Sequence, residues 1–428
     1  MQTQDKSAPG AKPQNASELF AKRLKRFEDA VQLKRPDAIP VVATFGNLMS
    51  ELAGCTKREL YEHPEREIPV LERAVLELQP DAATGMPLAP GISLELGDRM
   101  VLWPGHGIGD DDSFQVHEQE FMKSSEYDEL LRDPSDFAIR KFLPRMFSEL
   151  EGLAMLPPVS LSLGGYFGFL QGAMIFTLPP VVKALRALES AGASNARWIS
   201  HLMECSARLE KLGFPGIPFY NGATIWPPFD LIGNSLRGMK GIFLDMRRCP
   251  EKLLAAEERI IDVFVEHSVQ VSRVRNANYA HIATNRGSDG FISLRDFERF
   301  YWPQLKTIIF RLIENGITPY LSLEGVWDQR LKYLQELPKG KIIGQFQDTN
   351  LFKAKEMLGD TMCIVGGMPV SLLWGGTISE VEQHTKRVCQ EVGCGGGFIM
   401  YPSIGELQGC KWNLLKAWVE ATREYGTY

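Results

Sequence analysis

The stretch of residues 340–401 constrains the fold most, because short apolar runs alternate there with helical patterns at a regular interval. A glycine-rich entry, Gly395-Gly396-Gly397, leads into the last of these runs. Short apolar runs separated by helices indicate parallel strands that are buried on both faces. The expected strands cover residues 341–346, 362–366 and 395–401, and the expected helices cover residues 350–358 and 379–392.

Five earlier segments extend this pattern, with weaker signals toward the N-terminus. They cover residues 39–46, 81–86, 222–225, 279–284 and 318–325. With the three strands above, they give the number of strands that a (β/α)8 barrel needs. A chain of 428 residues can hold one such barrel with insertions. We therefore expect the α/β class, with a single (β/α)8 TIM barrel over residues 17–428.

Three regions lie outside the barrel pattern. Residues 1–16 are polar and contain proline and glycine, so a disordered tail is expected there. Residues 17–33 predict an amphipathic helix, an N-terminal helical extension. Near residues 92–176, glycines punctuate extended and helical segments, which predicts a long inserted hairpin or loop region.

Within that insertion, residues 161–176 are apolar but are interrupted by glycines. A buried or interface segment is favoured there over a membrane-surface segment. No apolar run approaches the roughly 20 residues that span a bilayer, so no membrane span is expected. A further alternative is that Tyr166 and Phe167 line a pocket or a docking face for a partner domain.

Composition and charge exclude several classes. Hydrophobic residues make up 44% and charged residues 23%, which is typical of a soluble globular protein. A net charge of -6 gives no electrostatic reason to expect nucleic acid as a partner. Seven cysteines without a Cys-x-x-Cys pair, together with an N-terminus that lacks a signal-peptide core, favour a cytoplasmic location.

Glu324 is the strongest candidate for chemistry. It follows an apolar strand, and catalytic groups of barrels hang from the carboxyl ends of strands. Burial at that place would raise the pKa of its carboxyl group. The structural alternative is an ion pair with Arg286 or Arg330.

Other strand ends supply candidates for substrate binding. Arg286 could hold a carboxylate, and Gln347 and Asp348 form a polar cluster, although Asp348 could instead cap a helix. His281 lies inside an apolar strand, where a core histidine is the simpler interpretation. Asn47 and Tyr401 complete the set, after the first strand and at the end of the last. No standard spacing for metal ligands is present.

Several motifs resemble those of the uroporphyrinogen decarboxylase superfamily, which contains tetrapyrrole decarboxylases and methylcorrinoid:thiol methyltransferases. The resemblance is good over residues 255–428. The matching positions are Gly359-Asp360 before residues 363–369, Gly376-Thr377, residues 395–399, Phe291-Ile292-Ser293, and Phe300-Tyr301-Trp302-Pro303.

The active-site residues of both branches are missing. Met86 stands near the position of the decarboxylase aspartate, and residues 402–405 supply no histidine. Where the thiol methyltransferases carry zinc ligands, this chain has Ser322-Leu323-Glu324 and Ser403-Ile404. An oxygen-rich zinc site is a further alternative, with Glu324 as a ligand and Gln347, Asp348 and Glu406 as candidate co-ligands.

The resemblance implies a corrinoid-dependent methyltransferase component. It would transfer a methyl group from a small O-, N- or S-methylated compound to a corrinoid bound on a partner protein, with Glu324 activating the leaving group. One alternative is a cofactor-free decarboxylase or lyase. Another is a non-catalytic barrel that acts as a binding subunit. The sequence also leaves a homo-oligomer open.

Overall fold

The computed structural model describes residues 15–86 and 88–428. The tail expected over residues 1–16 lies outside the described residues as far as residue 14. Helix α1 (Ala16–Val31) begins at the last residue of that expected tail, and the side chain of Asn15 caps it. Phe27 and Ala30 of α1 pack into a buried cluster together with residues of several barrel strands.

Eight parallel strands occupy the eight segments expected from the sequence. β6 to β11 form one sheet in sequential order, and β1 pairs with β2. A parallel bridge between Val41 and Met400 connects β1 with β11. The strands are β1 (Val42–Thr44), β2 (Ala82–Thr84), β6 (Ala223–Ile225), β7 (Tyr279–Thr284), β8 (Thr318–Leu323), β9 (Ile343–Phe346), β10 (Cys363–Met368) and β11 (Phe398–Pro402).

The order of the strands is that of a (β/α)8 barrel in which, over the part of the chain that the structure describes, one pair of neighbouring strands shares neither a ladder nor a bridge. Between β2 and β6 the described residues form no ladder. The backbone N–H of Ala83 instead donates to the carbonyl of Pro215 at 3.3 Å, ahead of β6. Inside the ring, residues from several strands pack as one buried cluster, which includes Val42, Tyr320, Ile343 and Ile399.

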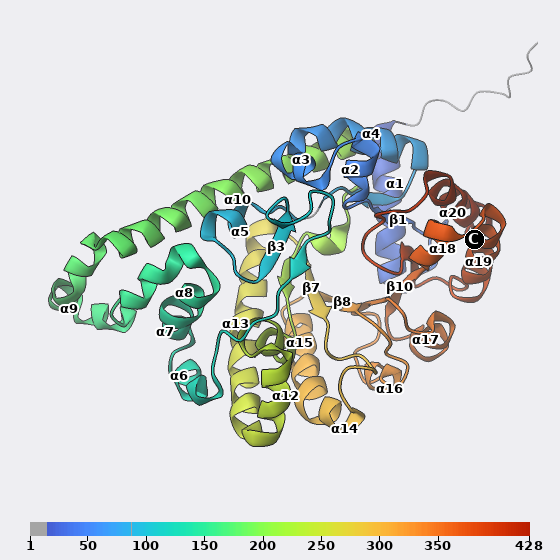
Figure 1. Ribbon diagram of the computed structural model, residues 1–428. Helices are drawn as coiled ribbons and strands as arrows, with labels where there is room; N and C mark the ends of the chain where they lie inside the picture. The colour runs from blue at the N-terminus through green and yellow to red at the C-terminus, as the bar shows by residue number, and fades with distance from the viewer. Residues whose placement is uncertain (1–14, 87) are drawn as a thin grey trace, which may run out of the picture.

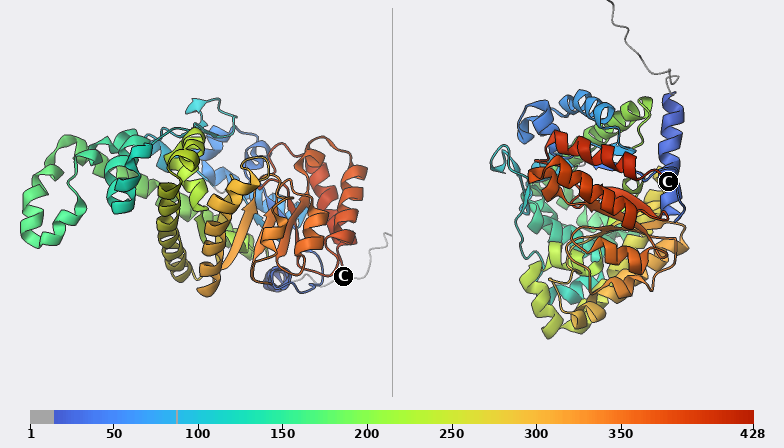
Figure 2. Two further views of the ribbon diagram at one scale, coloured as in Figure 1. Left: turned by 90° about the horizontal axis from the view of Figure 1, so that it is seen from below. Right: turned by 90° about the vertical axis from the view of Figure 1, so that its right-hand side faces the viewer.

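Helices cover the outside of this ring (Figures 1 and 2). Local sequence sets several of their ends: Thr56 with Glu59, and Thr377 with Glu380, form capping boxes. These helices are α2 (Leu48–Ala53), α3 (Lys57–Glu62), η1 (Pro64–Arg66), α4 (Glu67–Leu78), η7 (Pro218–Tyr220), α11 (Pro228–Leu231), η8 (Ile232–Leu236), α12 (Gly238–Arg248), α13 (Pro250–Arg275), α14 (Leu294–Asp296), η9 (Phe297–Tyr301), α15 (Trp302–Glu314), α16 (Leu331–Leu334), α17 (Leu351–Leu358), α18 (Val370–Gly375), α19 (Ile378–Glu391) and α20 (Trp412–Tyr425).

The chain between β2 and β6 forms the insertion. It opens with α5 (Gly91–Leu96) and a small sheet of β3 (Val101–Pro104), β4 (Gly107–Ile108) and β5 (Gln115–Val116). Short helices follow: η2 (Ser124–Glu126), α6 (Tyr127–Arg132), α7 (Pro134–Phe137), η3 (Ala138–Phe142), α8 (Leu143–Met146), η4 (Ser148–Met155), η5 (Val159–Gly164), α9 (Gly165–Gly172) and η6 (Ala173–Thr177). The last element is α10 (Pro179–Lys211), one helix of 33 residues.

The second half of the insertion projects away from the ring. We call residues 148–211 the arm, and residues 159–177 at its end the apolar tip. Figure 1 and the left view of Figure 2 both show α9 at the far end of the arm, away from the strands. This position contradicts the alternative in which Tyr166 and Phe167 line the pocket at the strand ends.

The apolar tip corrects two further expectations. Residues Val159–Thr177 are long and apolar enough, by length and composition only, to qualify as a membrane-spanning segment. The expectation that no run approaches this length was wrong, because the glycines interrupt the pattern without adding polarity. The tip is also almost entirely exposed, so it is not a buried segment.

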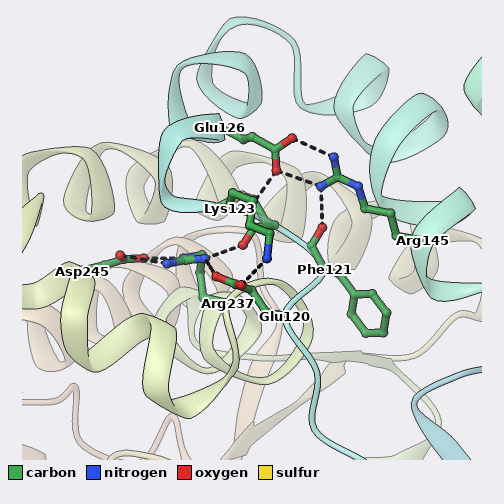
Figure 3. Close-up of polar contacts among 8 residues, drawn as sticks. Glu120, Phe121, Lys123, Glu126, Arg145, Arg237 and Asp245 are labelled. Atoms are coloured by element: carbon green, nitrogen blue, oxygen red, sulfur yellow. Dashed lines mark hydrogen bonds and ion pairs between the residues drawn. The ribbon is translucent and has the colours of Figure 1, made fainter.

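Ion pairs fasten the insertion to the barrel helices (Figure 3). Arg237 is buried and pairs with Asp245 on α12, and it also pairs with Glu120 from the insertion. Arg145 pairs with Glu126 at 2.7 Å and donates to the carbonyl of Phe121 at 2.7 Å. The pairing with Arg145 lowers the pKa of Glu126 to about 2. Arg237 therefore joins the insertion to α12, and Arg145 joins segments within the insertion just before the arm.

Candidate active site at the strand ends

A chain of tyrosine hydroxyl groups crosses the inside of the ring. The hydroxyl of Tyr401, on β11, lies 2.8 Å from Oγ1 of Thr44 on β1 and 3.0 Å from the hydroxyl of Tyr220. Burial raises the pKa of Tyr401 well above its usual value, so this group is neutral. The sequence placed Tyr401 at a strand end, and its two hydroxyl partners come from distant segments.

His281 belongs to a second polar group on β7, β8 and β9. Its Nε2 lies 3.0 Å from Oγ of Ser322, and that hydroxyl donates to Oε1 of Gln345 at 3.0 Å. Tyr320 also donates to this amide oxygen. When Ser322 directs its one proton to Gln345, its oxygen accepts a hydrogen bond from a protonated Nε2 of His281.

The imidazole of His281 is uncharged at neutral pH. Burial lowers its pKa to about 4. With Nε2 protonated, its Nδ1 keeps a lone pair that can accept a hydrogen bond. His281 is thus a partly buried acceptor in a neutral polar interior, and its proposed contact with substrate stays a prediction.

Glu324 follows β8 at the rim of the ring. Its backbone N–H donates to the carbonyl of Thr284 at 3.3 Å, and its carbonyl accepts from Nε1 of Trp327 at 2.9 Å. The residue is exposed to solvent, yet the surrounding rim partly desolvates the carboxyl group and raises its pKa, against a smaller lowering by Asn285. No ion pair joins Glu324 to Arg286 or Arg330 among the described residues.

The polar cluster after β9 remains open to solvent. Nε2 of Gln347 donates to Oδ2 of Asp348 at 3.1 Å. Asp348 is exposed, and the cap of α17 is Asn350, whose side chain accepts from the N–H of Lys353. The alternative in which Asp348 caps that helix is therefore wrong. Gln347 and Asp348 are free to contact a ligand.

Arg286 lies deeper and is engaged within the protein. Its Nε donates to Asn234 at 2.6 Å, and its terminal nitrogen pairs with Glu118 at 3.2 Å. Its guanidinium group also stacks over Phe291 at 5.1 Å. A substrate carboxylate would have to compete with Glu118 for this cation, so its binding role stays a prediction.

Asp230 is a polar residue of this region that the sequence did not reveal. It is fully buried on α11 and accepts from the backbone N–H groups of Asn285 and Arg286 at 3.0 and 2.8 Å, and from the hydroxyl of Tyr301 at 2.6 Å. Burial raises its pKa to about 7. Asp230 therefore positions the loop after β7, and only Pro227-Pro228 before it hinted at a special turn.

Glu406 and Asn47 meet on the opposite side of the mouth. A carboxylate oxygen of Glu406 accepts from the backbone N–H of Asn47, and Oδ1 of Asn47 accepts from Tyr61 at 3.0 Å. Burial raises the pKa of Glu406. Glu406 also lines an open pocket of about 440 Å³ together with Trp374, Ile404, Gln408 and Gly409.

The expected oxygen-rich metal site does not form as a cluster. Within residues 15–86 and 88–428, one group of three metal-binding side chains brings its ligand atoms within 4.8 Å of one another: Glu67, His201 and Cys205. Nε2 of His201 lies 2.7 Å from Oε2 of Glu67, whereas two ligands of a tetrahedral zinc ion would lie about 3.3 Å apart. The observed contact is a hydrogen bond that connects α10 with α4. A metal role for Glu324, Asp348 and Glu406 stays a prediction.

The strand order and the polar groups at the carboxyl ends define the class of (β/α)8 barrel proteins whose sites lie at that face. A family model described as Uroporphyrinogen decarboxylase (URO-D) matches residues 176–425. The match covers more than half of the chain, and the chain belongs to this family. The family expected from the motifs is thereby confirmed, and the match starts well before residue 255.

One similar solved structure is a methyltransferase from Methanosarcina mazei, with 15% sequence identity and a TM-score of 0.57. The similarity covers 94% of this chain and 98% of that chain. At this identity the likeness shows the fold. No curated protein sequence matches the chain. The family and the fold together indicate an enzyme.

Proposed function

We propose that the chain is the substrate-side methyltransferase of a corrinoid-dependent system. It would take a methyl group from a small O-, N- or S-methylated compound and pass it to a corrinoid held by a separate protein. Family membership and the fold likeness to a methyltransferase support this proposal. The observation that carries it is a carboxyl group of raised pKa, Glu324, at the rim of a neutral polar interior.

The chemistry needs a leaving group that departs with the electron pair of the methyl–heteroatom bond. A reduced corrinoid would supply the electron pair that accepts the methyl group. Glu324 would donate a proton to the departing heteroatom, and its raised pKa favours the protonated form that this step requires. Because Glu324 is open to solvent, water can return the proton.

The neutral interior argues against a tetrapyrrole substrate. Tyr401, His281 and Gln345 carry no charge there, and the pKa of His281 near 4 prevents it from acting as a cation. Arg286 follows β7 directly, and it is paired with Glu118. A substrate with several carboxylates would need several such cations.

The test combines the purified chain with cob(I)alamin and a panel of O-, N- and S-methylated compounds. We expect at least one compound to convert the cobalt(I) spectrum to that of methylcobalamin. Glu324→Gln should lower the rate about 100-fold, because a positioned general acid contributes on that order. The wild-type rate should fall as the pH rises through the pKa of Glu324, and this fall should be missing in the variant.

The control is Glu356→Gln, which neutralises an exposed carboxylate on α17 and should leave the rate unchanged. An unchanged cobalt spectrum across the whole panel would overturn the proposal. Release of carbon dioxide from uroporphyrinogen would assign the decarboxylase function instead.

A further inference from the structure

The apolar tip exposes large side chains that no other part of the described structure covers. Leu163 is 89% exposed, Met174 is 82% exposed, and Tyr166 and Phe167 are each 72% exposed. Within α9, Gly168 alone is buried. Monomeric proteins rarely leave so many contiguous large apolar groups in water. Nothing within residues 15–86 and 88–428 covers the tip.

The tip is also free of charge. No acidic, basic or histidine residue occurs between Glu151 and Lys183. Protein interfaces normally surround an apolar centre with a polar rim. Here the nearest charged groups lie at the base of the tip, at Glu149, Glu151 and Lys183. An apolar, uncharged environment therefore suits the surface of the tip.

Bulky groups cover a broad arc of α9. Tyr166, Phe167, Phe169 and Leu170 are each more than half exposed. At about 100° per residue, these four positions spread over roughly 160° of the helix circumference. Leu163 and Met174 extend the apolar surface to both sides of α9. A protein groove receives one stripe of a helix, whereas a fluid apolar phase can surround the whole tip.

The chain segments that enter and leave the tip lie next to each other. Nζ of Lys183 lies 2.7 Å from Oε2 of Glu149, so the incoming and outgoing segments are held together. Gly152 packs so closely on Pro180 that a Cβ there would lie 2.0 Å from the carbonyl oxygen of Pro180. Gly165, with φ +60°, turns the chain between η5 and α9. A single crossing of a bilayer is incompatible with this hairpin.

We propose that the apolar tip inserts into one leaflet of a lipid bilayer and attaches the protein to the membrane surface. The attachment comes from burial of apolar side chains, since the tip offers no cation to anionic headgroups. Tyr166 suits the boundary between headgroups and hydrocarbon, where amphipathic rings are enriched. This inference is independent of the methyl-transfer proposal, because its test uses no activity measurement.

The test is flotation of the full chain with vesicles of phosphatidylcholine, and with vesicles that also contain phosphatidylglycerol. We expect the protein to float with both kinds of vesicle to a similar extent and to do so at high salt. The triple variant Leu163→Ser, Phe167→Ser, Met174→Ser should reduce the bound fraction at least about tenfold. Circular dichroism should match the wild type, because these side chains are exposed in the fold.

The matched control is Val274→Ser, which removes an apolar side chain that is 86% exposed on α13. It should float like the wild type. A second measurement uses the variant Phe167→Trp. Relative to the wild type, the tryptophan fluorescence added by this substitution should shift to the blue with vesicles and be quenched by brominated lipid.

Two results would overturn the proposal. One is a wild-type chain that stays with the soluble fraction for both lipid compositions. The other is a concentration-dependent dimer that the triple variant dissociates, without any binding to vesicles. That second result would assign the tip to contact between copies of this chain.

Discussion

The carboxylate of Asp230 accepts three hydrogen bonds beneath the loop after β7. Asp230→Asn presents an N–H to at least one of these donors, so we expect a loss of about 1–3 kcal/mol in the free energy of unfolding. Urea unfolding measures this difference directly. A variant with unchanged stability would show that the loop holds its place without Asp230.

The same variant tests the raised pKa. Burial moves the pKa of Asp230 from its usual 3.8 to about 7, so between these values the folded chain binds the proton and the unfolded chain does not. This contribution to stability is complete below the lower value and is lost as the pH rises, by about 1.4 kcal/mol per pH unit at most. The stability gap between wild type and Asp230→Asn should therefore narrow between about pH 4 and about pH 7.

Sequence reasoning located the strand-end residues Glu324, Gln347 and Tyr401, because apolar runs mark where strands stop. It could not foresee their partners. Tyr401 meets Tyr220 and Thr44 across the ring, and Arg286 meets Glu118 from the insertion. Such contacts depend on how distant segments fold over the mouth, which no local pattern encodes. Asp230 escaped notice for the same reason.

Strand β6 approaches β7 through Gly222. A Cβ at this position would lie 1.6 Å from the carbonyl oxygen of Tyr279. Gly222→Ala should therefore separate the two strands and destabilise the protein by about 2–4 kcal/mol. Gly216→Ala is the control, because nothing lies within 4 Å of the Cβ built there. Equal unfolding midpoints for the two variants would contradict this account.

At the level of elements, the alternating pattern predicted all eight barrel strands. The arm was harder to foresee. Glycine and small polar residues near position 192 weaken the helical signal of α10. The helix continues through this region because it packs on α5 and η4. The exposure of residues 159–177 was also missed, because an apolar sequence does not reveal whether protein or another phase covers it.

For the whole molecule, the arm and the ring should be separable in stability. Replacing residues 159–177 with a short Gly/Ser linker removes side chains that are almost all exposed. The contacts of α10 with η4 and the Glu149–Lys183 pair are retained. We expect the melting temperature to stay within about 2 °C of wild type, since surface changes shift stability little. A large drop in calorimetry would show that the tip supports the ring.

Helix α10 has a geometric consequence for a protein attached through its tip. Its 33 residues rise about 50 Å, whereas one leaflet of hydrocarbon is about 15 Å thick. Most of the helix would then stand in water and hold the ring clear of the headgroups. A diffusing carrier protein could reach the open end of the ring without having to displace lipid.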